Sequence, residues 1–424
     1  MIVNKQEWQG LNINTIQTEK FKTLTFIVQF KNKLKADSVA ARSLATILLK
    51  KATKKYPSNK ALQKYLDTLY GARLTSSISR KGDLHQTAIQ LTVLNPAYVA
   101  DESYTIESII QFLYEVIYQP AEENGGFLND EFTVEKRNLE ETIKATYNDK
   151  IQYSLQRLND IMCADEPYIV RAYGVLEDYG KLTAANVFQY YKKMLAEDEI
   201  KISIIGDLAE LPIESMFKTI FPVQENHKEK IQMEFFPKII SEVKAEIEHQ
   251  DITQSKLNIG LRTNIFTNSS MYFAMKVAIG ILGGFPHSKL FTNVREKASL
   301  AYYASSYYDG SNGMAIIYAG IEAQNLTKAD AIIREQITDM LNGTFSDEDL
   351  SMTKRSMIND LREAADSVGG MSTLVDAIES LPAIYSLEDW LAAFDRVTRA
   401  DVVSAMQHVQ IDTTYILTSE GEVQ

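Results

Sequence analysis

The sequence repeats one order of strand and helix patterns in its two halves. Residues 71–94 contain two alternating strand patterns around a polar turn, and residues 300–321 show the same arrangement. In each half a helical pattern follows, and then an amphipathic pattern that starts with Lys-Arg, at residues 136–137 and 354–355. Since three segments recur in the same order, the repeat indicates two related halves.

The order of these patterns also favours one fold class. Strand-rich and helix-rich runs are partly segregated, which is typical of α+β layers rather than of a doubly wound sheet. Each half is therefore expected to form a sheet with helices packed on it. Charged residues accumulate at 223–251, before a new strand pattern. We predict domains at 1–224 and 249–424, joined by a linker at 225–248.

Composition argues against several kinds of partner. The net charge is −12 and no long block of lysine or arginine occurs, so we expect no nucleic-acid partner. No apolar run approaches the ~18–20 residues that a membrane-spanning helix needs, so we expect no membrane partner. The acidic surface either serves solubility alone or attracts basic peptides.

The cysteine content bears on the compartment. Cys163 is the single cysteine, which excludes an intrachain disulfide framework and a metal site built from cysteines alone. The N-terminal residues lack the basic-then-apolar layout of a signal peptide. Together these features predict a cytoplasmic location. Because no histidine lies close to Cys163 in the sequence, we expect an inert, half-buried thiol.

Common catalytic motifs are missing from the sequence. It contains no phosphate-binding loop, no dinucleotide fingerprint and no nucleophile elbow. The five histidines are scattered, and no two have the spacing at which a helix presents metal ligands. Asp83 and His85 are able to share one face of a strand, but two such ligands make a poor metal site. We expect both to be exposed turn residues.

One segment of the second half resembles a known family. Residues 282–303 combine a Gly283-Gly284 turn, a Ser-x-Leu-Phe run and the sequence Arg-Glu-x-x-x-Leu-Ala-Tyr from Arg295 to Tyr302. This pattern is similar to the C-terminal half of the pitrilysin-type metallopeptidases, which include insulin-degrading enzyme and the mitochondrial processing peptidase. The resemblance implies two homologous α/β-roll domains, each with a mixed, mainly antiparallel sheet. In the family, two such chains enclose a chamber that admits unfolded peptides.

The resemblance also shows what this chain lacks. Active members carry H-x-x-E-H on the first helix, where two histidines bind zinc and the glutamate activates water. The matching helix here has Ser43 and Ile47 at the histidine positions and Thr46 at the position of the base. Glu141 is the nearer match to the third ligand, followed by Glu140, and we expect Glu141 to be solvated or ion-paired. The resemblance therefore implies no zinc in this chain and no peptidase activity of the chain alone.

Arg295 and Tyr302 are the family residues that remain. In the family they reach toward the zinc site and donate hydrogen bonds to the bound peptide and the developing oxyanion. The resemblance therefore implies an inactive subunit of a heterodimeric peptidase, whose homologous partner supplies zinc, its ligands and the base. Gly283 and Gly284 would then form a mobile, substrate-contacting lip.

Alternatives stay open for each of these residues. Arg295 could form an ion pair at a helix end, and Tyr302 could be an ordinary strand residue. Gly283-Gly284 could be a tight connection after an apolar helix. For the whole chain, one alternative is a stand-alone structural or peptide-binding homodimer without a proteolytic role, and another is a peptidase that uses an unrecognised metal site.

Overall fold

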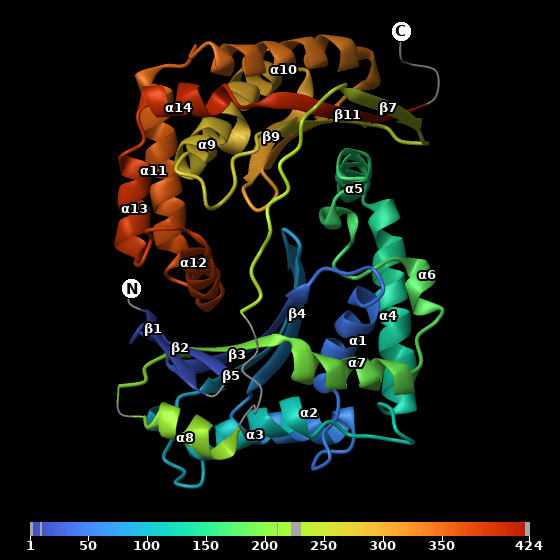
Figure 1. Ribbon diagram of the computed structural model, residues 1–424, viewed down its shortest axis with the longest axis vertical. Coiled ribbons are helices and arrows are strands. Elements are labelled where there is room, and N and C mark those ends of the chain that lie inside the picture. Colours follow the sequence, from blue (N-terminus) through green and yellow to red (C-terminus); the bar gives the residue numbers. More distant parts are fainter. Residues whose placement is uncertain (1–2, 9–10, 210, 222–229, 420–424) are drawn as a thin grey trace. The chain divides into compact units, whose positions relative to one another are not determined.

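The computed structural model describes residues 3–8, 11–209, 211–221 and 230–419 (Figure 1). It divides into two compact units. Unit 1 comprises residues 1–145 and 170–233, and unit 2 comprises residues 146–169 and 234–424. Compared with the predicted domains, segment 146–169 belongs by its contacts to unit 2. Of the predicted linker, residues 225–229 lie outside the described residues.

Unit 1 is built on a mixed, mainly antiparallel sheet. Among the described residues it has six strands in the order β1-β2-β6-β3-β5-β4, and the β2–β6 pair is parallel while the others are antiparallel. The strands are β1 (Val3–Trp8), β2 (Leu11–Gln17), β3 (Thr23–Lys33), β4 (Arg73–Lys81), β5 (Leu84–Leu94) and β6 (Glu199–Gly206). On β3, Leu24, Phe26, Val28 and Phe30 alternate into the core, as the two-residue period of a strand requires.

Helices cover the apolar side of this sheet. They are α1 (Val39–Leu49), α2 (Asn59–Thr68), α3 (Ile106–Tyr118), α4 (Asn129–Asn148), α6 (Leu176–Tyr179), α7 (Ala184–Glu197) and α8 (Ile213–Ile220). Every residue of α1 is buried, which fits a helix that is apolar nearly all round. Helix α1 is therefore a core element of unit 1.

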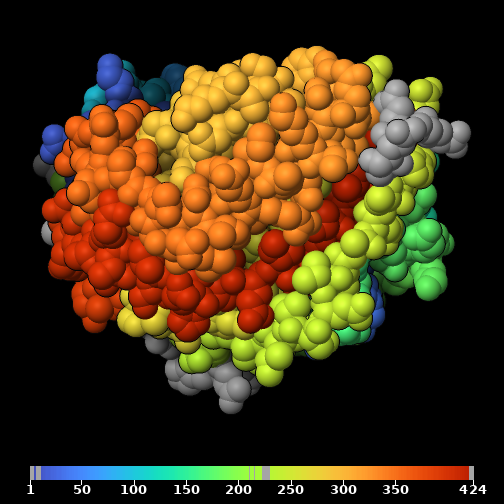
Figure 2. Space-filling view, turned by 90° about the horizontal axis from the view of Figure 1, so that it is seen from above, coloured from blue at the N-terminus to red at the C-terminus, as the bar shows by residue number. Residues whose placement is uncertain are grey.

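Unit 2 repeats the architecture with five strands among the described residues, in the order β7-β11-β8-β10-β9. They are β7 (Lys244–His249), β8 (Ser255–Arg262), β9 (Ala301–Asp309), β10 (Met314–Ile321) and β11 (Gln410–Thr418). Its helices are α5 (Lys150–Met162), α9 (Tyr272–Ile279), α10 (Leu326–Leu341), α11 (Asp347–Ala364), α12 (Val368–Ser380), α13 (Leu387–Asp395) and α14 (Arg399–Met406). Figure 2 shows β7 (yellow-green) running beside β11 (red), its parallel partner. The two sheets confirm the predicted α+β class.

Helix α5 comes from the first half of the sequence but packs on the sheet of unit 2. Its Leu158 lies in a buried cluster with Ile316, Tyr415 and Leu417. On β8, a Cβ at Gly260 would lie 2.5 Å from the Met162 sulfur, so α5 approaches the strand this closely because the residue is glycine. Since helices cover both faces of β8, every residue of that strand is buried.

A buried charge cluster connects segment 146–169, which contains α5, to the sheet of unit 2. The Arg262 guanidinium donates to the two carboxylate oxygens of Glu166 at 2.8 and 3.1 Å, and its Nε donates to Asp412 at 3.1 Å. All three side chains are buried, so the cost of removing these charges from water is offset by this bidentate geometry. Cys163 lies beside the cluster and is fully buried rather than half-buried, which raises the pKa of its thiol to about 12.

Among the residues described, no helix is both long and apolar enough to cross a membrane.

The Arg262 cluster predicts how segment 146–169 opens. Removing one partner of a buried pair costs about 3–5 kcal/mol. Glu166→Gln should therefore raise the labelling rate of Cys163 by a thiol reagent by roughly 10² or more, if labelling proceeds through opening of the segment. The control is Asp165→Asn. The Asp165 side chain is 83% exposed and its ion pair with Lys238 is long, at 3.9 Å, so removing its charge should change the labelling rate little. Equal labelling rates for Glu166→Gln and the unaltered chain would contradict this role of the cluster.

Candidate functional site

The three positions that match the zinc motif all lie in the core on α1. The Ser43 hydroxyl donates to the Ala172 carbonyl oxygen at 3.0 Å. Thr46 Oγ1 lies 2.9 Å from the Arg42 carbonyl oxygen and 2.9 Å from Thr87 Oγ1. Ile47 is buried in the apolar core and offers no ligand atom. The two hydroxyls are thus engaged within the protein.

Arg42 lies one residue before the first motif position, and its positively charged guanidinium occupies this region. The residue is 4% exposed, and Nη1 lies 2.7 Å from Asp198 Oδ1, which also accepts from Asn32 at 2.7 Å. Arg42 Nε donates to Nδ1 of His85 at 3.1 Å. Since Nδ1 accepts, the proton of the neutral ring is on Nε2, which donates to the Ala172 carbonyl at 2.9 Å.

The environment of His85 keeps its ring neutral. Burial and the positive charge of Arg42 lower its pKa to about 3. The expectation that Asp83 and His85 are exposed turn residues is wrong, because both are buried. Asp83 forms an ion pair with Lys33 at 2.5 Å, and His85 faces α1 from β5. The partners of both residues are distant in sequence, so the local sequence pattern does not indicate that the two side chains are buried.

Glu141, the match to the third zinc ligand, lies on the surface of α4. Its side chain is 65% exposed and pairs with Lys144 at 3.0 Å. Such exposed pairs contribute little stability. A catalytic zinc site needs three protein ligands with nitrogen, sulfur or carboxylate atoms, and Ser43 and Ile47, at the two histidine positions, supply none. Within the described ranges, no group of three or more His, Cys, Asp or Glu residues is placed to hold a metal ion. The residues present do not fit the zinc of the active relatives.

Arg295 lies in a π-helical turn, Phe291–Lys297, of unit 2. Its guanidinium stacks over the Phe291 ring, 4.6 Å from the ring centroid. In the described part of the chain it forms no ion pair, so the helix-end ion pair considered above is not found. The exposed guanidinium keeps its hydrogen-bond donors available.

Tyr302 projects from a bulge in edge strand β9. Ala301 pairs with Ile321 and Tyr303 pairs with Gly320, which leaves Tyr302 as the extra residue. The side chain is 62% exposed, and no described residue bonds its hydroxyl. Bulges redirect side chains and are frequent beside functional sites. Between the two residues, Ser299 has a φ of 52°, a costly conformation for a non-glycine residue.

The two glycines of the preceding turn have different surroundings. A Cβ at Gly283 would lie 2.6 Å from the Ser306 backbone nitrogen, so close packing against β9 requires glycine there. The Gly283 carbonyl also accepts from the Ser305 hydroxyl at 2.8 Å. Gly284 is exposed, and a Cβ there would have no neighbour nearer than 3.8 Å. Packing therefore explains Gly283 as a tight connection, while a substrate contact at Gly284 stays a prediction.

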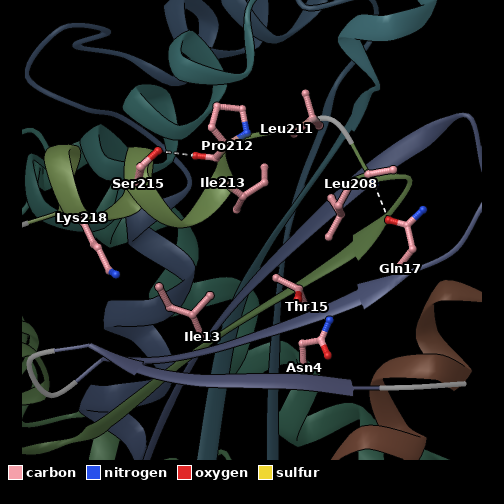
Figure 3. A pocket seen from close by; sticks show the side chains of 11 residues that line it. Asn4, Ile13, Thr15, Gln17, Leu208, Leu211, Pro212, Ile213, Ser215 and Lys218 are labelled. Atoms are coloured by element: carbon pink, nitrogen blue, oxygen red, sulfur yellow. Dashed lines mark hydrogen bonds between the residues drawn. The ribbon is translucent and has the colours of Figure 1, made fainter.

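A surface groove of about 700 Å³ lies between α8 and strands β1 and β2 of unit 1 (Figure 3). Part of its polar wall is already engaged: Gln17 Oε1 accepts from the Leu208 backbone nitrogen at 2.7 Å, and the Ser215 hydroxyl donates to the Pro212 carbonyl at 2.9 Å. Ser43, Thr46, Ile47 and Glu141 are not among its lining residues. This groove is separate from the zinc-motif positions.

Comparisons with known proteins agree with this geometry. The sequence model of the family described as "Peptidase M16 inactive domain" matches residues 181–357. A Bacillus subtilis (strain 168) protein named "Probable inactive metalloprotease YmfF" is 35% identical over 422 residues, covering 97% of each chain. An "Uncharacterized zinc protease YmxG" of the same strain is 24% identical over 200 residues, covering 46% of this chain and 47% of that protein.

Solved structures show the same fold. A conserved protein from Enterococcus faecalis V583 superposes with a TM-score of 0.90 at 30% identity, covering 100% of both chains. The peptidase M16 inactive domain from Pseudomonas fluorescens superposes with a TM-score of 0.81 at 16% identity, covering 100% of this chain and 99% of that one. The chain belongs to the M16, or pitrilysin-type, metallopeptidase family, as a non-catalytic member in which the zinc-binding motif is replaced.

Proposed function

We propose that this chain is the non-catalytic subunit of a two-chain M16-type zinc peptidase. A homologous partner would hold the zinc, its ligands and the general base. Arg295 and Tyr302 of this chain would bind an unfolded peptide and stabilise the oxyanion that forms on it. The observation that carries the proposal is the contrast between a filled zinc-motif region and two exposed donors without acceptors among the described residues.

The chemistry of the two donors supports this role. Arginine keeps its charge at any relevant pH, and a phenol donates one directed hydrogen bond. Stacking on Phe291 limits the positions of the guanidinium, so less conformational entropy is lost when it binds an acceptor. Preorganised donors of this kind stabilise a developing oxyanion, and removing one commonly lowers the rate by ~10²–10³.

Relatives named as zinc proteases support the existence of a suitable partner class. In this proposal the peptidase is cytoplasmic, as the sequence predicts. The second candidate function is a homodimer that binds peptides without cleaving them. It is favoured by β9, an edge strand with exposed Tyr302 and Tyr307, because such an edge is able to pair with an added strand.

The filled zinc-motif region predicts the metal content of the chain. After incubation with zinc and dialysis, the purified chain should retain far less than one zinc per molecule by elemental analysis. The reason is that the matching positions offer two engaged hydroxyls and an isoleucine. One tightly held zinc that is lost on Glu141→Gln would contradict this account.

The exposed donors predict the effect of substitution on a working mixture. When the chain is combined with a zinc-motif homologue that it activates, Arg295→Ala or Tyr302→Phe should lower kcat by ~10²–10³. Size-exclusion chromatography should show unchanged assembly of the two chains. Matched controls are Arg355→Ala, an exposed arginine on α11, and Tyr307→Phe on the same strand as Tyr302. Full activity of Arg295→Ala or Tyr302→Phe would show that the residue is not used.

His85 predicts a pH dependence of stability. Its pKa is about 3 in the fold and ~6.5 in an unfolded chain, so below pH ~6.5 the unfolded state binds a proton that the folded state does not. Stability should fall as the pH drops, by about 2–3 kcal/mol between pH 7.5 and 4.5 from this residue. In His85→Gln that contribution is absent. Urea denaturation measures the free energy of unfolding of both proteins across this range, and the difference between them should shrink as the pH falls. A difference that does not change with pH would argue against a neutral, buried His85.

A further inference from the structure

Unit 2 has a surface groove of about 700 Å³ that involves neither Arg295 nor Tyr302. It is lined by residues 267–271 and the start of α9, by the loop 382–384, and by residues at α13 and α14. Its apolar lining includes Phe273, Ile384 and Val397. A groove with these walls accepts an apolar side chain of moderate size.

Three hydrogen-bonding groups of this groove are unused. Arg396 lines it and is exposed, without an ion pair among the described residues. The first turn of α9 also lines it, where the N–H groups of Phe273 and Ala274 lack an acceptor within the helix and carry the positive end of its dipole. Thr267 is 5% exposed, and its Oγ1 has no partner in the described part of the protein.

The unpartnered hydroxyl points to a missing ligand. A buried hydroxyl without a hydrogen bond is unfavourable, and Thr267 is nevertheless placed at the wall of an open groove. Ala383, which also lines the groove, has a φ of 58°, a conformation that costs energy in a non-glycine residue. Backbone strain and an unused buried donor in the lining of one groove are both typical of a binding site.

The charges of the groove select the ligand. Asp401 is its acidic group, and Oδ2 accepts from the Thr398 nitrogen at 2.8 Å and from the Thr398 hydroxyl at 2.7 Å. These bonds cap α14 and lower the pKa of the Asp401 carboxyl. One guanidinium, one helix start and a nearby carboxylate suit a ligand with a single negative charge. A phosphate dianion would meet repulsion from Asp401 and find no second cation in the lining.

We propose that this groove binds the C-terminal carboxylate of a peptide whose last side chain is apolar. Arg396 and the start of α9 hold the carboxylate, and the hydroxyl of Thr267 completes its hydrogen bonds. The last side chain packs between Phe273 and Ile384. The site goes beyond the proposed oxyanion role, because it uses other residues and requires no partner chain.

Isothermal titration calorimetry on the full chain tests the site, with acetyl-Ala-Ala-Leu as the probe. The free acid should bind at least tenfold more tightly than the same peptide with a C-terminal amide. Octanoate and inorganic phosphate distinguish other sources of negative charge, and both should bind at least tenfold more weakly than the peptide acid. Equal binding of the acid and the amide, or of octanoate and the peptide, would overturn the proposal.

Variants separate binding from folding. Arg396→Gln should weaken binding of the peptide acid about tenfold to a hundredfold, since a hydrogen bond to a charged group is lost. Thr267→Val should weaken it a few fold without lowering Tm, because the removed hydroxyl has no partner in the unliganded protein. The control is Arg399→Gln, which pairs with Asp347 and does not line the groove. An unchanged affinity in a folded Arg396→Gln protein would contradict the site.

Discussion

A buried arginine lies one residue before the position at which active M16 peptidases have their first zinc-binding histidine. Arg42 is held by Asp198 and by neutral His85, and the rest of the region is arranged around it. A divalent cation placed here would be repelled by the Arg42 guanidinium and would meet a histidine whose Nδ1 is already occupied. Breaking a buried ion pair is costly, so this arrangement is also part of what stabilises α1 in the core. The region that the resemblance aligns with the zinc motif is therefore filled by a polar network of this chain's own side chains.

In unit 2 the two residues that match the family pattern, Arg295 and Tyr302, are exposed rather than buried. In its sheet, the register shift at Asp412 of β11 is covered, because Asp412 belongs to the buried Arg262 cluster. Between Arg295 and Tyr302, however, a π-helical turn, a left-handed serine and a bulge follow one another. This irregular backbone exposes a guanidinium and a phenol that an uninterrupted helix and strand would direct elsewhere. Such features are costly and tend to persist at functional sites.

Much of the fold was predictable because the repeat records the order of elements in both units. The placement of α5 was not, since an amphipathic pattern shows which face of a helix is buried but not which sheet covers it. Burial of His85 was missed for a related reason, because its partner Arg42 is 43 residues away. The bulge at Tyr302 depends on the register with β10, which strand patterns alone do not define. The zinc-motif positions, in contrast, rest on the resemblance alone, and a single helix, α1, carries all three.

The proposal that two chains share one active site is tested most directly by a titration. A zinc-motif homologue from the same organism is held at fixed concentration while this chain is added, and cleavage of an unfolded peptide is measured. The account predicts negligible cleavage by either chain alone. It also predicts a cleavage rate that rises until the two chains are present in equal molar amounts and then stays constant. A homologue that cleaves at full rate by itself, with no change when this chain is added, would contradict it.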